Sequence, residues 1–324
     1  MKELGADMTV ICPALPINGR TVYKGYLFIN DVLLNESGMR NHPLNPMLDA
    51  CLMRLMDAQA LGKSGNVPEQ TVIGGCEAVR AKLAELRASG ISYAVPDTLT
   101  DADLDILADA FFDLPLVTGG SGLGGAIARR YARETGKAVS ATCLGMPFGG
   151  KTILLSGSCS EMTNRQVAAY ARRGFMIKTD IDRCVADAEG YASEVFQVLV
   201  THAEGSLPPL VSATVPPEEL KIIQSRFGVE TSSRSVERFF ASLAVQLRNA
   251  GWDHFIIAGG ETSSIVSQAL HVSGFYIGSQ IAPGVPWVRT LDKKLSLALK
   301  SGNFGSEDFF FKALSFVPGM GKVV

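Results

Sequence analysis

The stretch "IIAGGETSS" (residues 256–264) places two glycines and a cluster of hydroxyl side chains where a strand becomes a helix. The opening "IIA" is apolar and typical of a buried strand, and "IVSQAL" (265–270) resumes with apolar residues at helical spacing. Glycine allows a ligand close to the backbone, and the unpaired N–H groups that begin a helix attract anions. The stretch therefore predicts an anion-binding turn at the carboxyl end of a strand in an α/β protein.

The same unit of strand, glycine turn and helix recurs along the chain. It appears in "LPLVTGGSGLGGAIARR" (114–130), "KTILLSGSCSEMTNRQV" (151–167) and "LSLALKSGNFGSEDFF" (295–310). Strands that alternate with helices indicate largely parallel sheets covered on both faces. We expect two three-layer α/β domains, residues 1–145 and 146–324, with a hairpin-like pair of "TVYKGYLFIN" (21–30) and "VLLNES" (32–37) in the first.

Composition limits the class of protein. The chain has 324 residues, is 47% hydrophobic and 19% charged, and has a formal net charge of −2. These values are typical of a globular protein, and they argue against a nucleic-acid binder, which would show a basic face. No apolar run reaches the ~18 residues of a membrane span. The widely spaced cysteines suit reduced thiols. We expect a cytoplasmic protein without nucleic-acid or membrane partners; a homo-oligomer is left open.

Two further motif matches occur in unsuitable contexts. "GMPFGGKT" (145–152) fits the P-loop pattern, but that loop should lead from a strand into a helix, whereas Thr152 opens a strand-like run. Lys151 is therefore interpreted as a solvated lysine at the strand entry. "GSGLGG" (120–125) fits a dinucleotide fingerprint, yet residues 136–160 contain no acidic side chain that could bind the ribose. A glycine-rich turn at a domain interface is the simpler interpretation.

A third match, "GSCSE" (157–161), resembles a nucleophile elbow, with Glu161 in place of the last glycine. Cys159 is then a candidate nucleophile, although cysteine is also among the most frequently buried residues, and a small residue filling the turn is the preferred interpretation. The histidines show no metal-binding spacing, and the candidate distant bases for Cys159 are His202, His254 and His271.

Taken together, the motifs resemble one family. The N-terminal stretch "CPALPINGRTVYKGYLFINDVLLNESGMRNHPLNPM" (12–47) resembles the four-carbon acid sugar kinases, and most closely their 3-oxo-tetronate kinases. Five further motifs match the same family in the same order: "LVTGGSGL", "LLSGSCSEMTNRQV", "AGGETSS", "IAPGVPW" and "LALKSGNFGSEDFF". The resemblance covers residues from about 8 to about 315.

The resemblance implies an N-terminal substrate domain and a C-terminal nucleotide domain. It implies transfer of a phosphoryl group from ATP, with Mg²⁺ neutralising the phosphates, to the terminal hydroxyl of a four-carbon sugar acid, such as 3-oxo-tetronate. The implied ATP-binding residues are Ser158, Gly259, Gly260, Glu261, Thr262, Ser263 and Gly302, with Lys300 and Asn303 as phosphate neighbours. The residues implied to face the sugar acid are Asn18, Gly19, Arg20, Arg40 and His42.

One departure from the family concerns the first domain. Family members begin with a strand that ends in an Asp-Asp-Phe-Thr-Gly-Ala-like motif, whereas this sequence starts with "MKELGAD" and has no such motif elsewhere. The departure predicts a partial sugar-acid-binding domain, from a truncated product or a start assigned too late, and leaves the catalytic group unassigned. Two alternatives to the kinase remain: an inactive nucleotide-binding fragment, and a Cys- or Ser-dependent acyl hydrolase that uses "GSCSE".

Overall fold

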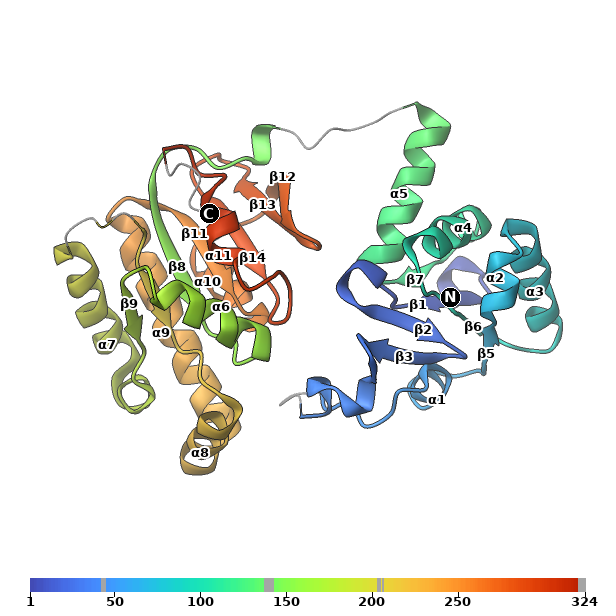
Figure 1. The fold of residues 1–324 in the computed structure, drawn as a ribbon, viewed down its shortest axis with the longest axis horizontal. Coiled ribbons are helices and arrows are strands. Elements are labelled where there is room, and N and C mark those ends of the chain that lie inside the picture. Colours follow the sequence, from blue (N-terminus) through green and yellow to red (C-terminus); the bar gives the residue numbers. More distant parts are fainter. Residues whose placement is uncertain (42–44, 137–142, 203–204, 206, 320–324) are drawn as a thin grey trace. The chain divides into compact units, whose positions relative to one another are not determined.

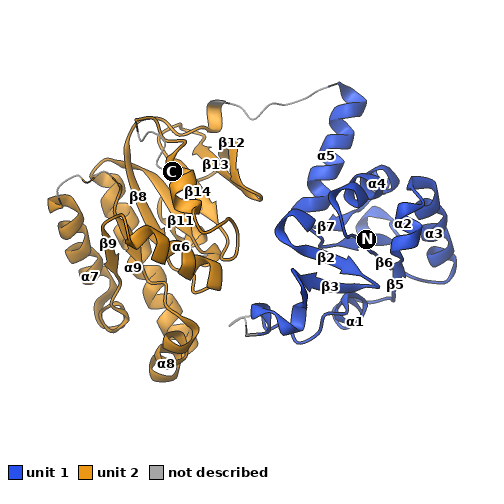
Figure 2. Cartoon of the chain, in the orientation of Figure 1, with its two compact units in different colours: residues 1–139 blue, residues 140–324 orange. Residues whose placement is uncertain are grey.

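The computed structural model describes five ranges of residues: 1–41, 45–136, 143–202, 205 and 207–319. The chain divides into two compact units, Met1–Val139 and Ser140–Val324 (Figure 2). This division falls a few residues before the boundary expected from the sequence. Each unit has its own sheets and its own apolar core.

The first unit contains short strands and helices in alternation. Its strands are β1 (Thr9–Cys12), β2 (Arg20–Tyr23), β3 (Tyr26–Ile29), β4 (Val32–Leu33), β5 (Ser64–Val67), β6 (Tyr93–Pro96) and β7 (Thr118–Gly119). Its α-helices are α1 (Leu52–Asp57), α2 (Glu69–Ile73), α3 (Cys76–Ala88), α4 (Asp101–Phe111) and α5 (Ser121–Thr135). Its 3-10 helices are η1 (Lys2–Leu4), η2 (Pro16–Asn18), η3 (Leu34–Glu36) and η4 (Gly38–Asn41).

A four-stranded sheet in the order β5-β6-β1-β7 forms the centre of this unit, and every neighbouring pair runs parallel (Figure 1). Buried residues such as Val10, Val67 and Val95 place these strands in one apolar core. The core also includes Leu83 of α3 and Leu107 of α4. The parallel arrangement confirms the α/β class predicted from the alternating pattern.

The prediction of a hairpin between residues 21–30 and 32–37 is partly wrong. β2 pairs antiparallel with β3, so the segment 21–30 folds back on itself, and β4 adds a third strand beside β3. Lys24 and Gly25, the two residues between β2 and β3, have φ of 52° and 74°. Two positive φ values are the signature of the tightest hairpin turn. The sequence contains this signal as a Lys-Gly pair, which is weaker than the usual Asn-Gly.

The glycine-rich segment 118–125, which leads from β7 into α5, serves close packing inside the first unit. A Cβ on Gly122 would lie 2.4 Å from the carbonyl oxygen of Ala14, and one on Gly119 would lie 2.9 Å from that of Cys12. The backbone of this turn therefore packs directly on the chain that leaves β1. Such contact requires residues without a side chain, so packing accounts for these two glycines without a dinucleotide.

The second unit has longer elements. Its strands are β8 (Lys151–Ser156), β9 (Met176–Lys178), β10 (Leu210–Ser212), β11 (Trp252–Ala258), β12 (Phe275–Ala282), β13 (Val285–Thr290) and β14 (Ser296–Lys300). Its helices are η5 (Cys143–Gly145), α6 (Glu161–Ala171), α7 (Ile181–Thr201), α8 (Pro217–Phe227), α9 (Val229–Asn249), α10 (Gly260–Ala269) and α11 (Phe309–Leu314). The strands form one sheet in the order β12-β13-β14-β11-β8-β10-β9, antiparallel at β12 and β13 and parallel elsewhere.

Helices cover both faces of this sheet (Figure 1). Ile153 and Ile257 point to one face, where they join a core with residues of α7, α9 and α10. Their neighbours Leu154 and Ile256 point to the other face and join residues of α6 and α11. Successive side chains of a strand face opposite sides, so a strand buried on both sides reads as a continuous apolar run. The second unit is therefore a three-layer α/β body.

The long helices are amphipathic rather than uniformly apolar. α9 buries Phe239, Phe240, Leu243 and Leu247 while its charged residues, such as Arg238, remain exposed. One apolar stripe on a polar helix is the pattern of a helix that packs on a sheet. Among the described residues, no helix combines the length and apolar character needed to cross a bilayer.

Candidate nucleotide-binding edge

The carboxyl ends of three adjacent strands meet at one edge of the second sheet. β14, β11 and β8 are neighbours, and their last residues, Lys300, Ala258 and Ser156, lie in register across the sheet. The chain therefore turns at the same level after all three strands. Ligands of open α/β sheets bind at this kind of edge. We call the turns that follow these strands (157–160, 259–260 and 301–303) the three-turn edge.

Short backbone contacts hold the three turns together. The N–H groups of Gly157 and Ser158 donate to the carbonyl oxygen of Ala258 at 3.0 and 3.2 Å. The N–H of Gly259 donates to the carbonyl oxygen of Lys300 at 2.7 Å. Each turn is thus fixed by the end of the neighbouring strand, which gives the edge a rigid backbone.

Gly302 lies against the hydroxyl groups of the first turn. A Cβ on Gly302 would lie 2.8 Å from Ser158 Oγ and 3.0 Å from Ser160 Cβ. The hydroxyls continue as a chain: Ser158 donates to Ser160 Oγ at 3.2 Å, and Ser160 donates to Thr163 Oγ1 at 3.0 Å. Thr163 in turn donates to the carbonyl oxygen of Gly302 at 2.7 Å. The chain of hydroxyls joins the first and third turns.

Gly260 is the open position of the edge. A Cβ there would meet nothing within 4 Å, and α10 begins at this residue without a side-chain cap. Glu261 is exposed beside it, whereas Thr262 is buried. A Cβ on Gly157 or Gly259 would approach Thr262 Oγ1 closely. The uncapped N–H groups can donate hydrogen bonds to an anionic ligand, and the free space above them can hold it.

All seven ATP-binding residues predicted from the sequence lie within the three-turn edge or in the first turn of α10. Ser263 differs from the others in its surroundings, because its hydroxyl is buried in α10 without a hydrogen-bond partner among the described residues. Ser160 and Thr163 were not among the predicted site residues. The N-cap pattern of "SEMT" (160–163) does predict that the hydroxyl of Ser160 accepts a hydrogen bond from the backbone N–H of Thr163. Their reach across to Gly302 could not be read from that pattern.

Lys300 is buried beneath the three-turn edge. Its side chain has no exposed surface, and Nζ donates to Thr163 Oγ1 at 3.0 Å and to the carbonyl oxygens of Ser301 and Gly302 at 3.1 and 2.6 Å. Burial lowers the pKa of Lys300 to about 7. The family resemblance implied that Lys300 is a phosphate neighbour, which stays a prediction; in the structure Nζ holds the third turn through two carbonyl oxygens and contacts Thr163 of α6. Asn303 is exposed.

Two carboxylates lie near the first turn of α10. Burial, followed by the proximity of Glu261, raises the pKa of Glu237 on α9. Like charges at close range favour the protonated form of one carboxyl group, so a cation between them would be favourable. No group of three or more His, Cys, Asp and Glu side chains within the described ranges forms a metal site.

Cys159 lacks the surroundings of a nucleophile. Burial raises the pKa of its thiol, which reduces the thiolate fraction that attacks carbonyl carbons. None of the described hydrogen bonds joins it to a histidine: His254 bonds Asp253 through Nδ1 at 2.6 Å, and His202 stacks on Phe175. The geometry therefore does not favour the acyl hydrolase.

Lys151 lies at the opposite end of β8 from the three-turn edge. It is the exposed first residue of the strand, and its Nζ lies 4.9 Å from the centre of the Trp252 ring. A P-loop lysine would instead begin a helix and reach the phosphates. The P-loop match is accidental, as the sequence context indicated.

Replacing Lys151 with alanine should leave ATP affinity within about twofold of the parent, because its Nζ lies over the ring of Trp252 at the opposite end of β8 from the three-turn edge. Isothermal titration calorimetry of Lys151→Ala and the parent with Mg²⁺–ATP measures the difference. A tenfold loss, about 1.4 kcal/mol, would show that the lysine reaches the nucleotide.

The residues predicted to face a sugar acid lie in the first unit, on the chain that follows β1. Asn18 ends η2, and Gly19, with φ 68°, accepts at 2.7 Å from the N–H of Asn30. Arg20 begins β2, and burial lowers its pKa. Arg40 is exposed in η4 and donates to the carbonyl oxygen of Asn35 at 3.2 Å. His42 lies outside the described residues.

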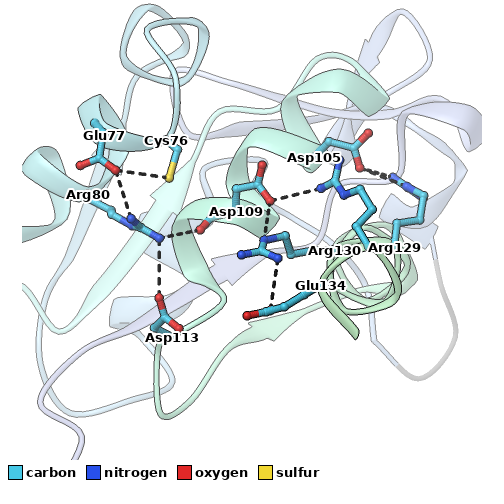
Figure 3. Close-up of polar contacts among 10 residues, drawn as sticks. Cys76, Glu77, Arg80, Asp105, Asp109, Asp113, Arg129, Arg130 and Glu134 are labelled. Carbon is cyan, nitrogen blue, oxygen red and sulfur yellow. Dashed lines mark hydrogen bonds and ion pairs between the residues drawn. The ribbon is translucent and has the colours of Figure 1, made fainter. Parts of the chain in front are cut away.

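A hollow of about 400 Å³ on the first unit is lined mainly by charged side chains. Figure 3 shows the ion pairs that these side chains form. Arg130 of α5 pairs with Asp109 of α4 at 3.0 Å, and Arg133 approaches the same carboxylate at 3.2 Å. Arg80 of α3 pairs with Glu77 and donates to the backbone oxygen of Asp109. Exposed pairs of this kind contribute little each, and the paired arginines leave no excess charge for an anion.

Comparison with known proteins gives a separate family model for each half of the chain. Residues 1–127 match the family model of a sugar-binding N-terminal domain, and residues 153–310 match that of a nucleotide-binding C-terminal domain. A 3-oxo-tetronate kinase of Brucella melitensis biotype 1 is 51% identical over 314 residues, which are 97% of this chain and 72% of the relative. The 3-oxo-tetronate kinase of Salmonella typhimurium is 48% identical over 315 residues, 97% and 74% of the two chains.

Solved structures show the same fold. A Salmonella typhimurium LT2 protein described as a tRNA synthase has a TM-score of 0.82 at 48% identity, covering 97% of this chain and 74% of its own. The Haemophilus influenzae protein HI1011 has a TM-score of 0.69 at 51% identity, covering 96% and 74%. The two domain models together cover most of the sequence. The kinase relatives each match 97% of it. The chain therefore belongs to the four-carbon acid sugar kinase family.

Proposed function

We propose that this chain transfers the γ-phosphoryl group of ATP to the terminal hydroxyl of a four-carbon sugar acid, with 3-oxo-tetronate as the substrate. The observation that supports it best is the three-turn edge, where the ends of three adjacent parallel strands and the uncapped start of α10 converge. The kinase names of the relatives supply the reaction class and the acceptor.

The three-turn edge has the chemistry to hold the phosphates. The N–H groups at the start of α10 are donors, and Gly260 leaves space directly above them, while the hydroxyl of Ser158 lies in the neighbouring turn and donates to Ser160. A charge-assisted hydrogen bond contributes roughly 1.5–3 kcal/mol, whereas micromolar affinity requires about 8 kcal/mol. One turn would be insufficient, and donors from several turns acting together would reach this value.

The carboxylates of Glu261 and Glu237 fit a requirement for Mg²⁺. A polyphosphate at the start of α10 would bring further negative charge beside Glu261, which only a cation can offset. Mg²⁺ is commonly held by one or two carboxylates together with substrate phosphates, and Glu261 and Glu237 would supply the protein oxygens. When bound, the ion neutralises charge that develops on the transferred group.

In the first unit, Arg20 and Arg40 would bind the carboxylate of the sugar acid. The guanidinium fork matches a carboxylate in two places, and Asn18 offers a polar side chain on the same stretch of chain. In the transfer, a bond forms between the substrate hydroxyl oxygen and the γ-phosphorus, the bond to the ADP oxygen breaks, and the hydroxyl proton is lost. The residue that accepts this proton is unassigned.

A coupled ADP-release assay with Mg²⁺–ATP and 3-oxo-tetronate tests the function. We expect turnover that requires the sugar acid, with only a background rate when the acid is omitted. Calorimetric titration of ATP into the same preparation separates binding from catalysis. Tight binding without turnover would support the alternative, an inactive nucleotide-binding protein, and would contradict the kinase.

A further inference from the structure

Lys300 is a buried amine without an acidic partner among the described residues. Its contacts are Thr163 Oγ1 and the carbonyl oxygens of Ser301 and Gly302, together with the Phe309 ring at 5.8 Å from Nζ. Lysine is almost never fully buried unless it is paired, because taking a charge out of water is costly. A site that keeps such a residue needs a compensating charge from elsewhere.

The hydrogen-bond geometry around Nζ suits the protonated form. An ammonium group has three N–H donors, which match the three acceptors, whereas a neutral amine has two. Burial acts in the opposite direction and is the sole cause of the lowered pKa. The amine is therefore balanced between two forms near neutral pH, and a nearby anion would shift it to the charged form.

The other titratable and charged groups on the surrounding elements do not supply that anion. On α6, Glu161 is exposed and pairs with Arg165; on α11, Lys312 pairs with Asp308 at 3.0 Å. Glu261 on α10 and Glu307, two residues before α11, are exposed. The remaining titratable group in the first turn is the partly buried thiol of Cys159, whose raised pKa keeps it neutral.

We propose that Lys300 is a positioning residue that becomes fully charged when an anion occupies the three-turn edge, so that nucleotide binding takes up a proton. The inference rests on the function proposed above, since the nucleotide phosphates are the anion. Nζ holds the carbonyl oxygens of Ser301 and Gly302, and through Thr163 it holds the start of α6. Its charge therefore supports the phosphates from below while its hydrogen bonds fix the turns that contact them.

The sign of the linkage follows from the direction of the shift. In the free protein Lys300 loses its proton as pH rises through about 7; in the complex it keeps the proton to higher pH. Binding at pH 8 should therefore take up between about 0.5 and 1 proton per nucleotide. Affinity should weaken as pH rises from 7 to 9, by up to about tenfold per pH unit.

Calorimetric titration of Mg²⁺–ATP at pH 8, in Tris and in HEPES, measures this uptake from the difference in apparent enthalpy. Lys300→Met should remove the uptake, and Lys300→Arg, which keeps a charge that does not titrate in this range, should also remove it. Lys151→Met is the matched control and should show the parental uptake.

The outcomes separate the two proposals. Nucleotide binding by the parent without proton uptake, or unchanged uptake in Lys300→Met, would overturn the role of Lys300 alone. No nucleotide binding by the parent would overturn the proposed function and this inference with it. The parental measurement needs no variant, so a folding defect in Lys300→Met leaves the proposal testable.

Discussion

Gly260→Val is expected to weaken ATP binding at least about a hundredfold while the protein stays folded. The new Cβ would meet nothing within 4 Å and the position lacks a positive φ, so the fold has no reason to resist the valine. The side chain would instead fill the space above the start of α10, where the phosphates are proposed to lie. A hundredfold loss corresponds to about 2.7 kcal/mol, roughly one or two charge-assisted hydrogen bonds.

Gly149→Val is the matched control for this experiment. A Cβ on Gly149 likewise meets nothing within 4 Å, and the residue is exposed just before β8, at the opposite end of that strand from the three-turn edge. Its affinity for ATP should equal that of the parent. Calorimetric titration of both variants, with circular dichroism as a check on folding, measures the contrast. Equal affinities of Gly260→Val and the parent would remove this turn from the binding site.

Local sequence pattern was sufficient to find the three turns, because each combines an apolar strand with glycine and hydroxyl residues at its end. It could not show that β14, β11 and β8 are adjacent, since β9 and β10 lie between β8 and β11 in the sequence but not in the sheet. That order decides which turns meet. Register completes the arrangement by aligning Ser156, Ala258 and Lys300.

The side-chain environment of Lys300 could not be predicted for a related reason. A lysine at the end of a strand beside a glycine turn is usually exposed, and the family resemblance implied only that Lys300 lies near a phosphate. Its burial results from packing of α6 and α11 on the same face of the sheet, which brings Thr163 and Phe309 to it. Such contacts join residues far apart in the sequence, and no periodicity encodes them.

The first unit shows the same limit in a different form. The glycines at 119 and 122 lie at the predicted passage from a strand to a helix, from β7 to α5, but only the close approach of Cys12 and Ala14 explains them. The incomplete sugar-acid-binding domain expected from the missing paired-Asp motif stays a prediction, as do the homo-oligomer, the cytoplasmic location and the requirement for Mg²⁺.

Arg20→Gln should raise the KM for the sugar acid about a hundredfold and leave ATP affinity unchanged. The backbone of Arg20 is fixed by paired hydrogen bonds with Leu15, at 2.8 and 3.1 Å. The side chain of Arg20 therefore extends from a rigid part of the backbone. Burial that lowers the pKa of a guanidinium also strengthens its attraction to an anion, because less water screens the charge. Glutamine keeps polarity and much of the length but loses the charged fork.

Initial rates of ADP release at varied sugar-acid concentration measure the KM, and calorimetry measures the affinity for ATP. Arg87→Gln is the control in the same unit. Arg87 lies on α3, where its exposed guanidinium pairs with Asp7 at 3.2 Å, and its loss should leave both the KM and the ATP affinity unchanged.

Arg40→Gln should have a smaller effect on the KM than Arg20→Gln, about tenfold or less, because the exposed Arg40 interacts with its ligand through water-screened charge. A parental KM in Arg20→Gln would exclude this arginine from the sugar-acid site. Arg20→Lys should restore only part of the affinity, since an ammonium group does not reproduce bidentate contact with a carboxylate.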